Sequence, residues 1–169
     1  MILDLKNQEE FPATIEQTAE SLATKPDRED VLGVENVRAN LTVQHADEEY
    51  FCQGKISADF KLECARCLSE FVTKIGGKTD FIIRHGRPTT RDDREIPDDE
   101  EYVDLLDDLT ADISYIVSQT LSLGLPMKPI CKDDCQGLCP ACGINRNDKK
   151  CDCKTEQIDE RWEGLQGLF

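Results

Sequence analysis

Three closely spaced cysteine pairs near the end of the chain are the residues best suited to chemistry. Six cysteines lie within 23 residues, and the pairs are Cys131 with Cys135, Cys139 with Cys142, and Cys151 with Cys153. Thiolates grouped this closely bind a metal ion or exchange disulfides. The chain has nine cysteines, an odd number that a framework of disulfides alone would leave incompletely paired. The cluster therefore indicates a metal site or thiol redox chemistry.

The motif Cys139-Pro-Ala-Cys142-Gly143 has the form of a zinc knuckle. Two residues between the ligands let both sulfurs reach one ion, and a glycine after the second cysteine accepts the positive φ that such a turn needs. Cys151 and Cys153 are close enough to complete the site. Only eight residues separate the two pairs, fewer than the roughly 15–20 of a zinc ribbon. We therefore expect a compact clip in which these four cysteines hold one zinc ion.

A further pair, Cys64 and Cys67, follows a predicted strand, and 63 residues separate it from Cys131. This pair can combine with Cys131 and Cys135 in a second tetrahedral site, which would staple the tail onto the sheet. It can instead join the pair that begins at Cys139, and the spacing leaves both arrangements open. Four protein ligands close a structural zinc site. The chain therefore has the ligands for one or two zinc ions.

Thiol redox chemistry by Cys64 and Cys67 is the alternative interpretation of this pair. Thioredoxin-like pairs lie at the start of a helix within a βαβ unit, whereas these two cysteines lie among antiparallel strand patterns. Cys52 stands alone in a strand-like stretch, and we expect it to be buried as a small apolar residue. His45 and His85 lie outside any ligand motif and are interpreted as ordinary surface or sheet residues.

Acidic residues dominate the charge of the chain, which has a formal net charge of −15 at pH 7. Eleven acids and one base, Arg94, lie between Asp92 and Asp112, and this segment supplies two-thirds of the net charge. A uniformly acidic surface would repel nucleic acid, because binding there depends on neutralising phosphates. We interpret the segment as a solvated loop. The alternative is that it attracts a basic partner such as a ribosomal protein.

The chain has 169 residues, which suits one domain with a modest core or a domain with an appendage. Its first ten residues have neither the basic start nor the apolar run of a secretory signal. No stretch reaches the roughly 20 apolar residues that cross a bilayer. We therefore expect a cytoplasmic protein without membrane contact, where cysteine clusters serve metals more often than disulfides.

Apolar and polar residues alternate through residues 31–85, as in strands with one buried face. The alternating residues are Val37, Ala39, Leu41 and Val43, then Ile56, Ala58, Phe60 and Leu62, then Phe71, Thr73 and Ile75, and finally Phe81 and Ile83. Turns at 46–48 and at Gly76-Gly77 are predicted to separate these runs. The pattern predicts an antiparallel meander or small barrel of about four to five strands.

One main helix is predicted at about 108–123, where apolar residues recur at helical spacing, with Asp107 or Asp108 as its cap. Short strands are predicted near Ile2 and at 102–105, and a helical or irregular stretch at 14–22. The fold class is therefore α+β. The predicted division is a β-rich domain over 1–125, with an acidic loop at 86–104, and a cysteine-rich zinc-binding tail over 126–169 with a short helix at 158–168.

No catalytic set stands out in the sequence, which has neither a phosphate-binding glycine loop nor a serine nucleophile elbow. The carboxylates are mostly consecutive, and nothing indicates a paired general acid and base. We therefore expect a chain that is not an enzyme.

Two parts of the chain resemble the YceD family, whose members are called large ribosomal RNA subunit accumulation proteins. One is Leu62-Glu-Cys-Ala-Arg-Cys-Leu68, and the other is the run from Leu125 to Asn145 with Cys151-Asp-Cys153 and the closing Asp159-Glu-Arg-Trp162. Some members lack the cysteine-rich tail, so zinc is not essential to the role of the whole family. The resemblance implies a part in the accumulation of large-subunit ribosomal RNA and no defined catalytic activity.

The leading hypothesis is a non-catalytic factor in ribosome biogenesis that contacts the large-subunit precursor or its proteins. Basic residues of the cysteine-rich region outnumber acidic ones by only two, and each zinc site with four thiolates adds a charge of about −2. The sequence therefore does not decide whether this region contacts RNA directly. The bases are Lys128, Lys132, Arg146, Lys149, Lys150 and Lys154, and the acids are Asp133, Asp134, Asp148 and Asp152. The alternatives are a thiol redox protein and a zinc adaptor for a non-ribosomal protein.

Overall fold

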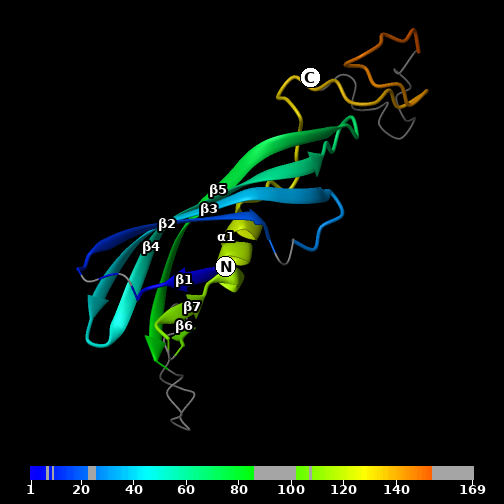
Figure 1. The fold of residues 1–169 in the computed structure, drawn as a ribbon. Helices are drawn as coiled ribbons and strands as arrows, with labels where there is room; N and C mark the ends of the chain where they lie inside the picture. Colours follow the sequence, from blue (N-terminus) through cyan, green and yellow to red (C-terminus); the bar gives the residue numbers. More distant parts are fainter. Residues whose placement is uncertain (7, 9, 23–25, 86–101, 107, 154–169) are drawn as a thin grey trace, which may run out of the picture.

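Strands of one sheet make up most of the computed structural model, which describes all residues except 7, 9, 23–25, 86–101, 107 and 154–169 (Figure 1). In chain order, the elements are β1 (Ile2–Asp4), β2 (Ala13–Ser21), β3 (Val31–Ala46), β4 (Glu49–Glu63), β5 (Glu70–His85), β6 (Tyr102–Leu105), β7 (Thr110–Asp112) and α1 (Ser114–Gly124). Among the described residues the sheet has seven strands in the order β1-β7-β6-β5-β4-β3-β2.

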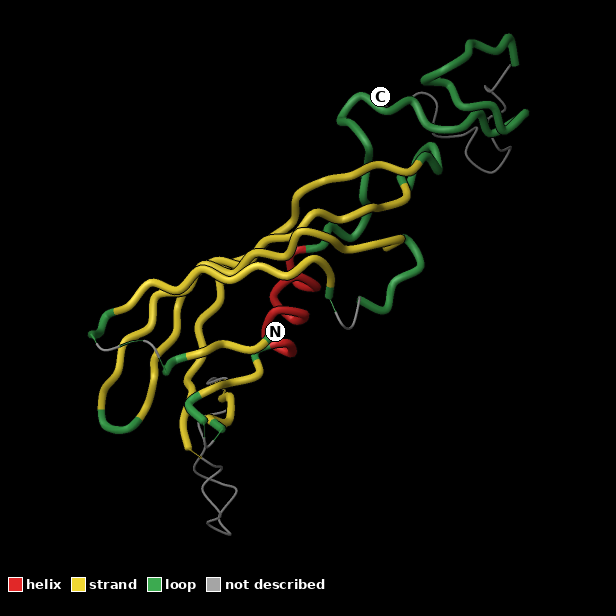
Figure 2. The backbone as a smooth tube through the Cα atoms, viewed as in Figure 1, coloured by secondary structure: helices red, strands yellow, loops and turns green. Residues whose placement is uncertain are grey.

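The sheet is antiparallel except where β6 runs parallel to β5. It curves into a nearly closed barrel, and the helix α1 lies inside the curve, against β5 and β4 (Figure 2). A mainly antiparallel meander or small barrel with one main helix was predicted, and the described residues form the barrel, with one short helix. The strands β1 and β6 also lie where the sequence predicted short strands.

The alternation of side chains explains why the long strands form and which face they bury. On β4 the even-numbered residues from Cys52 to Leu62 include five buried apolar side chains, and the odd-numbered residues face outward. Their period of two matches a pleated strand with one face in the core. Apolar residues of α1 fill the inside of the curve, where Ile116, Val117 and Leu121 are buried.

The prediction of a turn at Gly76-Gly77 was wrong, and residues 31–85 form three strands instead of four to five. Both glycines lie within β5, whose pairing with β4 continues without a register shift from Glu70 to Arg84. A Cβ on Gly76 would lie 2.4 Å from the Ile56 carbonyl oxygen. A Cβ on Gly77 would lie 3.1 Å from Thr120 Cγ2 on α1. These glycines therefore permit close packing. They do not reverse the chain.

The helix begins later than predicted, because residues 110–112 pair with β1 as strand β7. A tight turn joins β6 to β7, with Leu109 at φ 56°. The predicted cap was also wrong: the N-cap residue is Ile113, and Asp112 Oδ1 accepts a hydrogen bond from the Ser114 backbone N–H at 2.9 Å. Long-range pairing overrides local helical periodicity here.

The stretch at 14–22, predicted as helical or irregular, is mostly strand β2. The predicted turn at 46–48 is confirmed as the β3–β4 hairpin, with positive φ at Asp47 and Glu48 as in a type I′ turn. The greater part of the acidic loop and the predicted terminal helix lie outside the described residues. The division into a domain and a tail stays a prediction.

Candidate metal centres

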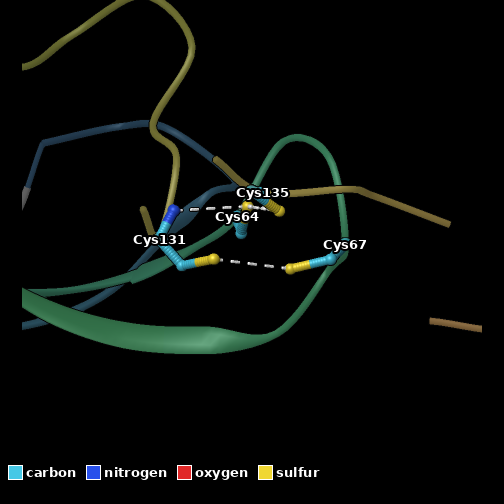
Figure 3. Close-up of side chains that lie close together, drawn as sticks. All are labelled: Cys64, Cys67, Cys131 and Cys135. Carbon is cyan, nitrogen blue, oxygen red and sulfur yellow. Dashed lines mark hydrogen bonds between the residues drawn. The ribbon is translucent and has the colours of Figure 1, made fainter. Parts of the chain in front are cut away.

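Four cysteines from two distant parts of the chain meet at one end of the sheet (Figure 3). Cys64 directly follows β4, Cys67 lies in the β4–β5 loop, and Cys131 and Cys135 come from the segment after α1. All four sulfurs lie within 4.8 Å of one another. The Sγ atoms of Cys64 and Cys135 are 3.9 Å apart, and those of Cys67 and Cys131 are 3.7 Å apart.

These separations suit a tetrahedral zinc ion. A zinc–sulfur bond of about 2.3 Å gives sulfur–sulfur edges of roughly 3.8 Å in a tetrahedron. Cys64, Cys67 and Cys135 are buried and form a small cluster of their own, with Phe71 and Ile130 packed against it. Uncompensated thiolates are costly in such surroundings. The donor set and its geometry therefore fit a divalent, thiophilic ion.

Backbone N–H groups stabilise the thiolate form of Cys64 in this cluster. Burial raises the pKa of the Cys64 thiol, but hydrogen bonds from the backbone N–H groups of Arg66, Cys131 and Cys67 outweigh it and lower the pKa to about 6. The Cys131 N–H lies 3.4 Å from Cys64 Sγ. Burial raises the pKa of Cys131 to about 12, together with hydrogen bonding to its neighbouring sulfurs. A cation would replace the protons that the four sulfurs share.

Cys135 has a hydrogen-bond donor from further along the tail. Burial raises its pKa, but hydrogen bonds outweigh this effect and lower the pKa, and the largest comes from the Asn147 side chain. Asn147 Nδ2 lies 3.4 Å from Cys135 Sγ. Hydrogen bonds to the ligands are typical of metal centres, where they orient and tune the sulfurs.

The second cluster consists of Cys139, Cys142, Cys151 and Cys153, whose sulfurs also lie within 4.8 Å of one another. Cys139 is buried, Cys151 is half-buried, and the other two are exposed. Hydrogen bonds from the backbone N–H groups of Cys142 and Ala141 lower the pKa of Cys139 to about 6. Hydrogen bonding to Cys142 raises the pKa of Cys153 to about 12. This cluster is local to the tail and lies nearer the surface than the first.

The two clusters share one turn geometry. In the first, Leu68 N donates to Cys64 O at 2.9 Å and Cys64 N donates to Ser69 O at 3.0 Å. In the second, Gly143 N donates to Cys139 O, and Cys139 N donates to Ile144 O, both at 2.8 Å. The residue after the second cysteine has a positive φ in both turns, 58° at Leu68 and 72° at Gly143. Both pairs are therefore knuckles.

Arg66 anchors the tail to the first knuckle. Its carbonyl oxygen accepts a hydrogen bond from Leu138 N at 2.9 Å, and its Nη1 donates to the Cys135 carbonyl oxygen at 3.1 Å. Next to it, Ala65 N donates to Pro129 O at 2.8 Å. Gly137 has a φ of 69°, and a Cβ there would lie 3.0 Å from Arg66 O. The tail approaches the hairpin closely enough to require glycine at this position.

The structure separates the eight candidate ligands into two sets of four, and Cys64 and Cys67 group with Cys131 and Cys135. Sequence reasoning named all eight cysteines but left this partition open. It missed Arg66 and Asn147, whose roles depend on tertiary contacts, and Leu68, whose positive φ belongs to the local turn. The doublet Gln136-Gly137 between two cysteines was a usable signal, because glycine there indicates a close backbone approach.

The remaining candidates lie away from both clusters. Cys52 is buried in β4, as predicted, and burial raises its pKa to about 12. His45 lies on β3 and stacks on Tyr50, with ring centroids 4.5 Å apart. The side chain of His85 lies outside the described residues. None of the helices in the described part of the chain combines the length and the apolar character needed to cross a membrane.

The family model described as Large ribosomal RNA subunit accumulation protein YceD matches residues 52–169, which include both clusters. The chain belongs to the YceD family. An uncharacterized protein of Mycobacterium tuberculosis is 32% identical over 126 residues, which cover 75% of this chain and 58% of the relative. An uncharacterized protein of Mycobacterium leprae is 26% identical over 109 residues, 64% of this chain and 48% of the relative.

A plant relative carries a functional name. The large ribosomal RNA subunit accumulation protein YCED homolog 1, chloroplastic, of Arabidopsis thaliana is 37% identical over 57 residues, 34% of this chain and 18% of the relative. The chain spans about 58% of the length of the mycobacterial relative with 32% identity. No solved structure matches this chain.

Proposed function

We propose that this chain is a non-catalytic factor in ribosome biogenesis that supports the accumulation of large-subunit ribosomal RNA. The observation that carries the proposal is the YceD family match over residues 52–169. The name of the plant relative supports it. The described residues contribute a scaffold of sheet, helix and two sulfur clusters.

Each cluster, on this proposal, holds one zinc ion in a structural role. Four protein sulfurs per cluster leave no open position for a substrate or an activated water, whereas catalytic zinc keeps such a position. Bound zinc would fix the tail to the hairpin loop and give the chain a rigid end. This arrangement is the physical basis for proposing that the chain is not an enzyme.

The proposed partner is the large-subunit precursor, contacted mainly through its basic proteins. The formal net charge of −15 attracts basic protein and repels RNA phosphates. The cysteine-rich region does not reverse this, because two four-thiolate zinc sites would add about −4 to its small basic surplus. Direct RNA contact is therefore the secondary route in this proposal.

Depletion of the chain in its native host tests the proposed function. We expect a fall in large-subunit RNA relative to small-subunit RNA, and co-sedimentation of the chain with large-subunit precursors on sucrose gradients. Complementation with the wild-type chain is the control, and Cys131→Ser/Cys135→Ser tests whether the first cluster is needed. Unchanged RNA levels together with no precursor association would reject the proposal.

A thiol redox role is the second candidate, and one observation favours it: the pKa of Cys64 is about 6. Yet Cys64 is fully buried, so its thiolate has no access to a substrate disulfide. Metal analysis and thiol titration of anaerobically purified protein separate the two roles. Two zinc ions per chain with protected thiols support the structural role, whereas metal-free protein with a reversible Cys64–Cys67 disulfide supports the redox role.

A further inference from the structure

The strand β2 presents an open edge of the sheet. It pairs with β3 on one side, and no other described strand forms backbone ladder hydrogen bonds with it. The pairing is continuous from Ala13 to Ala19, so no bulge twists this edge away. A free edge of this length is a template for another strand.

The side chains of β2 do little to exclude an incoming strand. Its nine residues include no lysine, arginine or proline, which are common edge protectors. Glu16 and Glu20 are its charged residues, and both are exposed on the outer face. On the inner face, Ile15 and Ala19 are only half-buried, although they pack against the main core. The apolar row is therefore incompletely covered at this seam of the barrel.

A cavity of about 420 Å³ lies beside the second half of β2. It is lined by Ala19 and Leu22 next to Val37 of β3, and by Ser114, Tyr115 and Ser118 of α1. The cavity is large enough for an apolar side chain from an added strand. Tyr115 is 71% exposed and can close over such a side chain.

Gln17, at the seam between β2 and β1, has a hydrogen-bond acceptor without a partner among the described residues. Its Nε2 donates to the carbonyl oxygen of Ile2 at 2.5 Å, which spans the gap between β2 and β1. Its Oε1 is buried and has no hydrogen-bond partner among the described residues. Buried polar atoms of this kind are rare in folded proteins. A backbone or side-chain donor from an incoming segment would satisfy it.

We propose that the β2 edge and the adjoining cavity bind an extended basic segment of a partner protein by strand addition. The segment has apolar side chains on alternate positions, which enter the cavity and cover Ile15 and Ala19. The intervening side chains are lysine or arginine, which lie beside Glu16 and Glu20. Main-chain hydrogen bonds supply affinity in this binding mode, and the alternating side chains supply specificity.

Charge decides between this partner and two others. A second copy of this chain would place Glu16 and Glu20 against the same residues, and like charges on adjacent strands are destabilising. RNA would bring phosphates toward these glutamates without a cation on β2 to receive them. A basic, strand-forming peptide is the class that matches both the edge and its charge.

Assigning the basic segment to a large-subunit protein rests on the proposed function, but strand addition does not. Binding is measured on the purified full chain, without ribosomes. Peptide binding together with unchanged RNA in depleted cells would support strand addition at β2 and refute the ribosomal assignment of the partner. Absence of peptide binding together with a fall in large-subunit RNA would support the ribosomal role and refute strand addition.

The probe is a fluorescein-labelled nine-residue peptide of alternating lysine and valine, and affinity is read by fluorescence anisotropy. A block isomer with the same composition and an alternating glutamate–valine peptide are the peptide controls. We expect both to bind at least tenfold more weakly. Glu16→Lys/Glu20→Lys is expected to weaken binding of the lysine peptide at least tenfold, because two attractive pairs become repulsive. Asp133→Lys/Asp148→Lys changes the net charge equally on the distant tail and should leave affinity within twofold.

Amide hydrogen exchange by NMR locates the site. We expect the peptide to slow exchange within residues 14–21 in the wild-type chain and not in Glu16→Lys/Glu20→Lys. Equal binding by both double variants, or protection confined to other strands, would overturn the proposal. Protection of β2 that rises with protein concentration alone would also overturn the proposal, because it indicates self-pairing. Displacement of the peptide by single-stranded RNA, with loss of the preference over the block isomer, would overturn it as well.

Discussion

Removing the ligands of the first cluster should detach the tail while leaving the sheet folded. The change is Cys131→Ser/Cys135→Ser, which removes the two tail sulfurs and retains those beside β4 and β5. The hydrogen bonds that dock the tail include Ala65 N to Pro129 O and Leu138 N to Arg66 O. Arg66 Nη1 to Cys135 O is another. Each contributes about 1 kcal/mol net, so together they supply only a few kcal/mol.

Conformational entropy opposes this docking by a larger amount. Ordering residues 129–153 costs at least about 1 kcal/mol per residue, or roughly 25 kcal/mol in total. A structural zinc ion supplies about 10–16 kcal/mol in small peptides. The docking hydrogen bonds alone therefore fall well short of the ordering cost, and bound zinc would be the larger stabilising contribution. Without the first ion, the tail should no longer remain attached to the hairpin.

The assay combines zinc content by mass spectrometry with amide hydrogen exchange. We expect the double variant to lose one zinc ion per chain and to lose protection in residues 129–138. Protection in β3, β4 and β5 should persist, because the main core contains none of the eight candidate ligands. Cys153→Ser, in the second cluster, is the matched control and should lose one ion while residues 129–135 stay docked. A tail that remains protected after full zinc loss would refute this reasoning, as would simultaneous unfolding of the sheet.

Three further predictions concern individual residues. Cys52 should resist alkylation at pH 8 until the chain unfolds, because it is buried in β4 and burial raises its pKa to about 12. Cys64 and Cys139, whose pKa values are lowered to about 6, should react once a chelator has removed zinc and loosened the tail, and thiol counting by mass spectrometry checks this. Gly77→Ala should lower the free energy of unfolding by about 1–3 kcal/mol through contact with Thr120 Cγ2, and adding Thr120→Ser should recover part of the loss in denaturant titrations. Gly54→Ala should destabilise more than Gly33→Ala, since a Cβ on Gly54 would lie 2.0 Å from Asn40 O, whereas one on Gly33 meets only Lys61 Cβ at 3.8 Å; the same titrations distinguish them.

Periodicity predicted the strands whose inner faces are uniformly apolar. The runs around Val37 to Val43 and Ile56 to Leu62 lie on β3 and β4 as expected. The strand β2 was missed because its inner row includes Gln17 at the barrel seam, which breaks the apolar alternation. The strand β7 was missed because its three residues pair with β1, more than 100 positions earlier in the sequence. Local patterns contain no information about a partner that distant.

The candidate ligands were easier to predict than their grouping. Cysteine spacing identifies knuckles, because each knuckle is a local turn. Which pair meets which knuckle depends on where the tail crosses the β4–β5 loop. Hydrogen bonds of Arg66 and the positive φ of Gly137 determine that crossing. The misread doublet Gly76-Gly77 has the same cause, since those glycines accommodate neighbouring elements and no local signal distinguishes them from a turn.

The first cluster is an extension of the sheet, because Cys64 continues the buried row of β4. The even-numbered residues Ile56, Ala58, Phe60, Leu62 and Cys64 are all at most 1% exposed. A slip of one residue in the pairing of β4 would turn this whole row outward and remove Cys64 from the other three sulfurs. A metal ion held at this cluster and correct strand register would therefore stabilise one another. In the described part of the chain, the tail is thus positioned from the end of the sheet by the sulfur cluster and its hydrogen bonds.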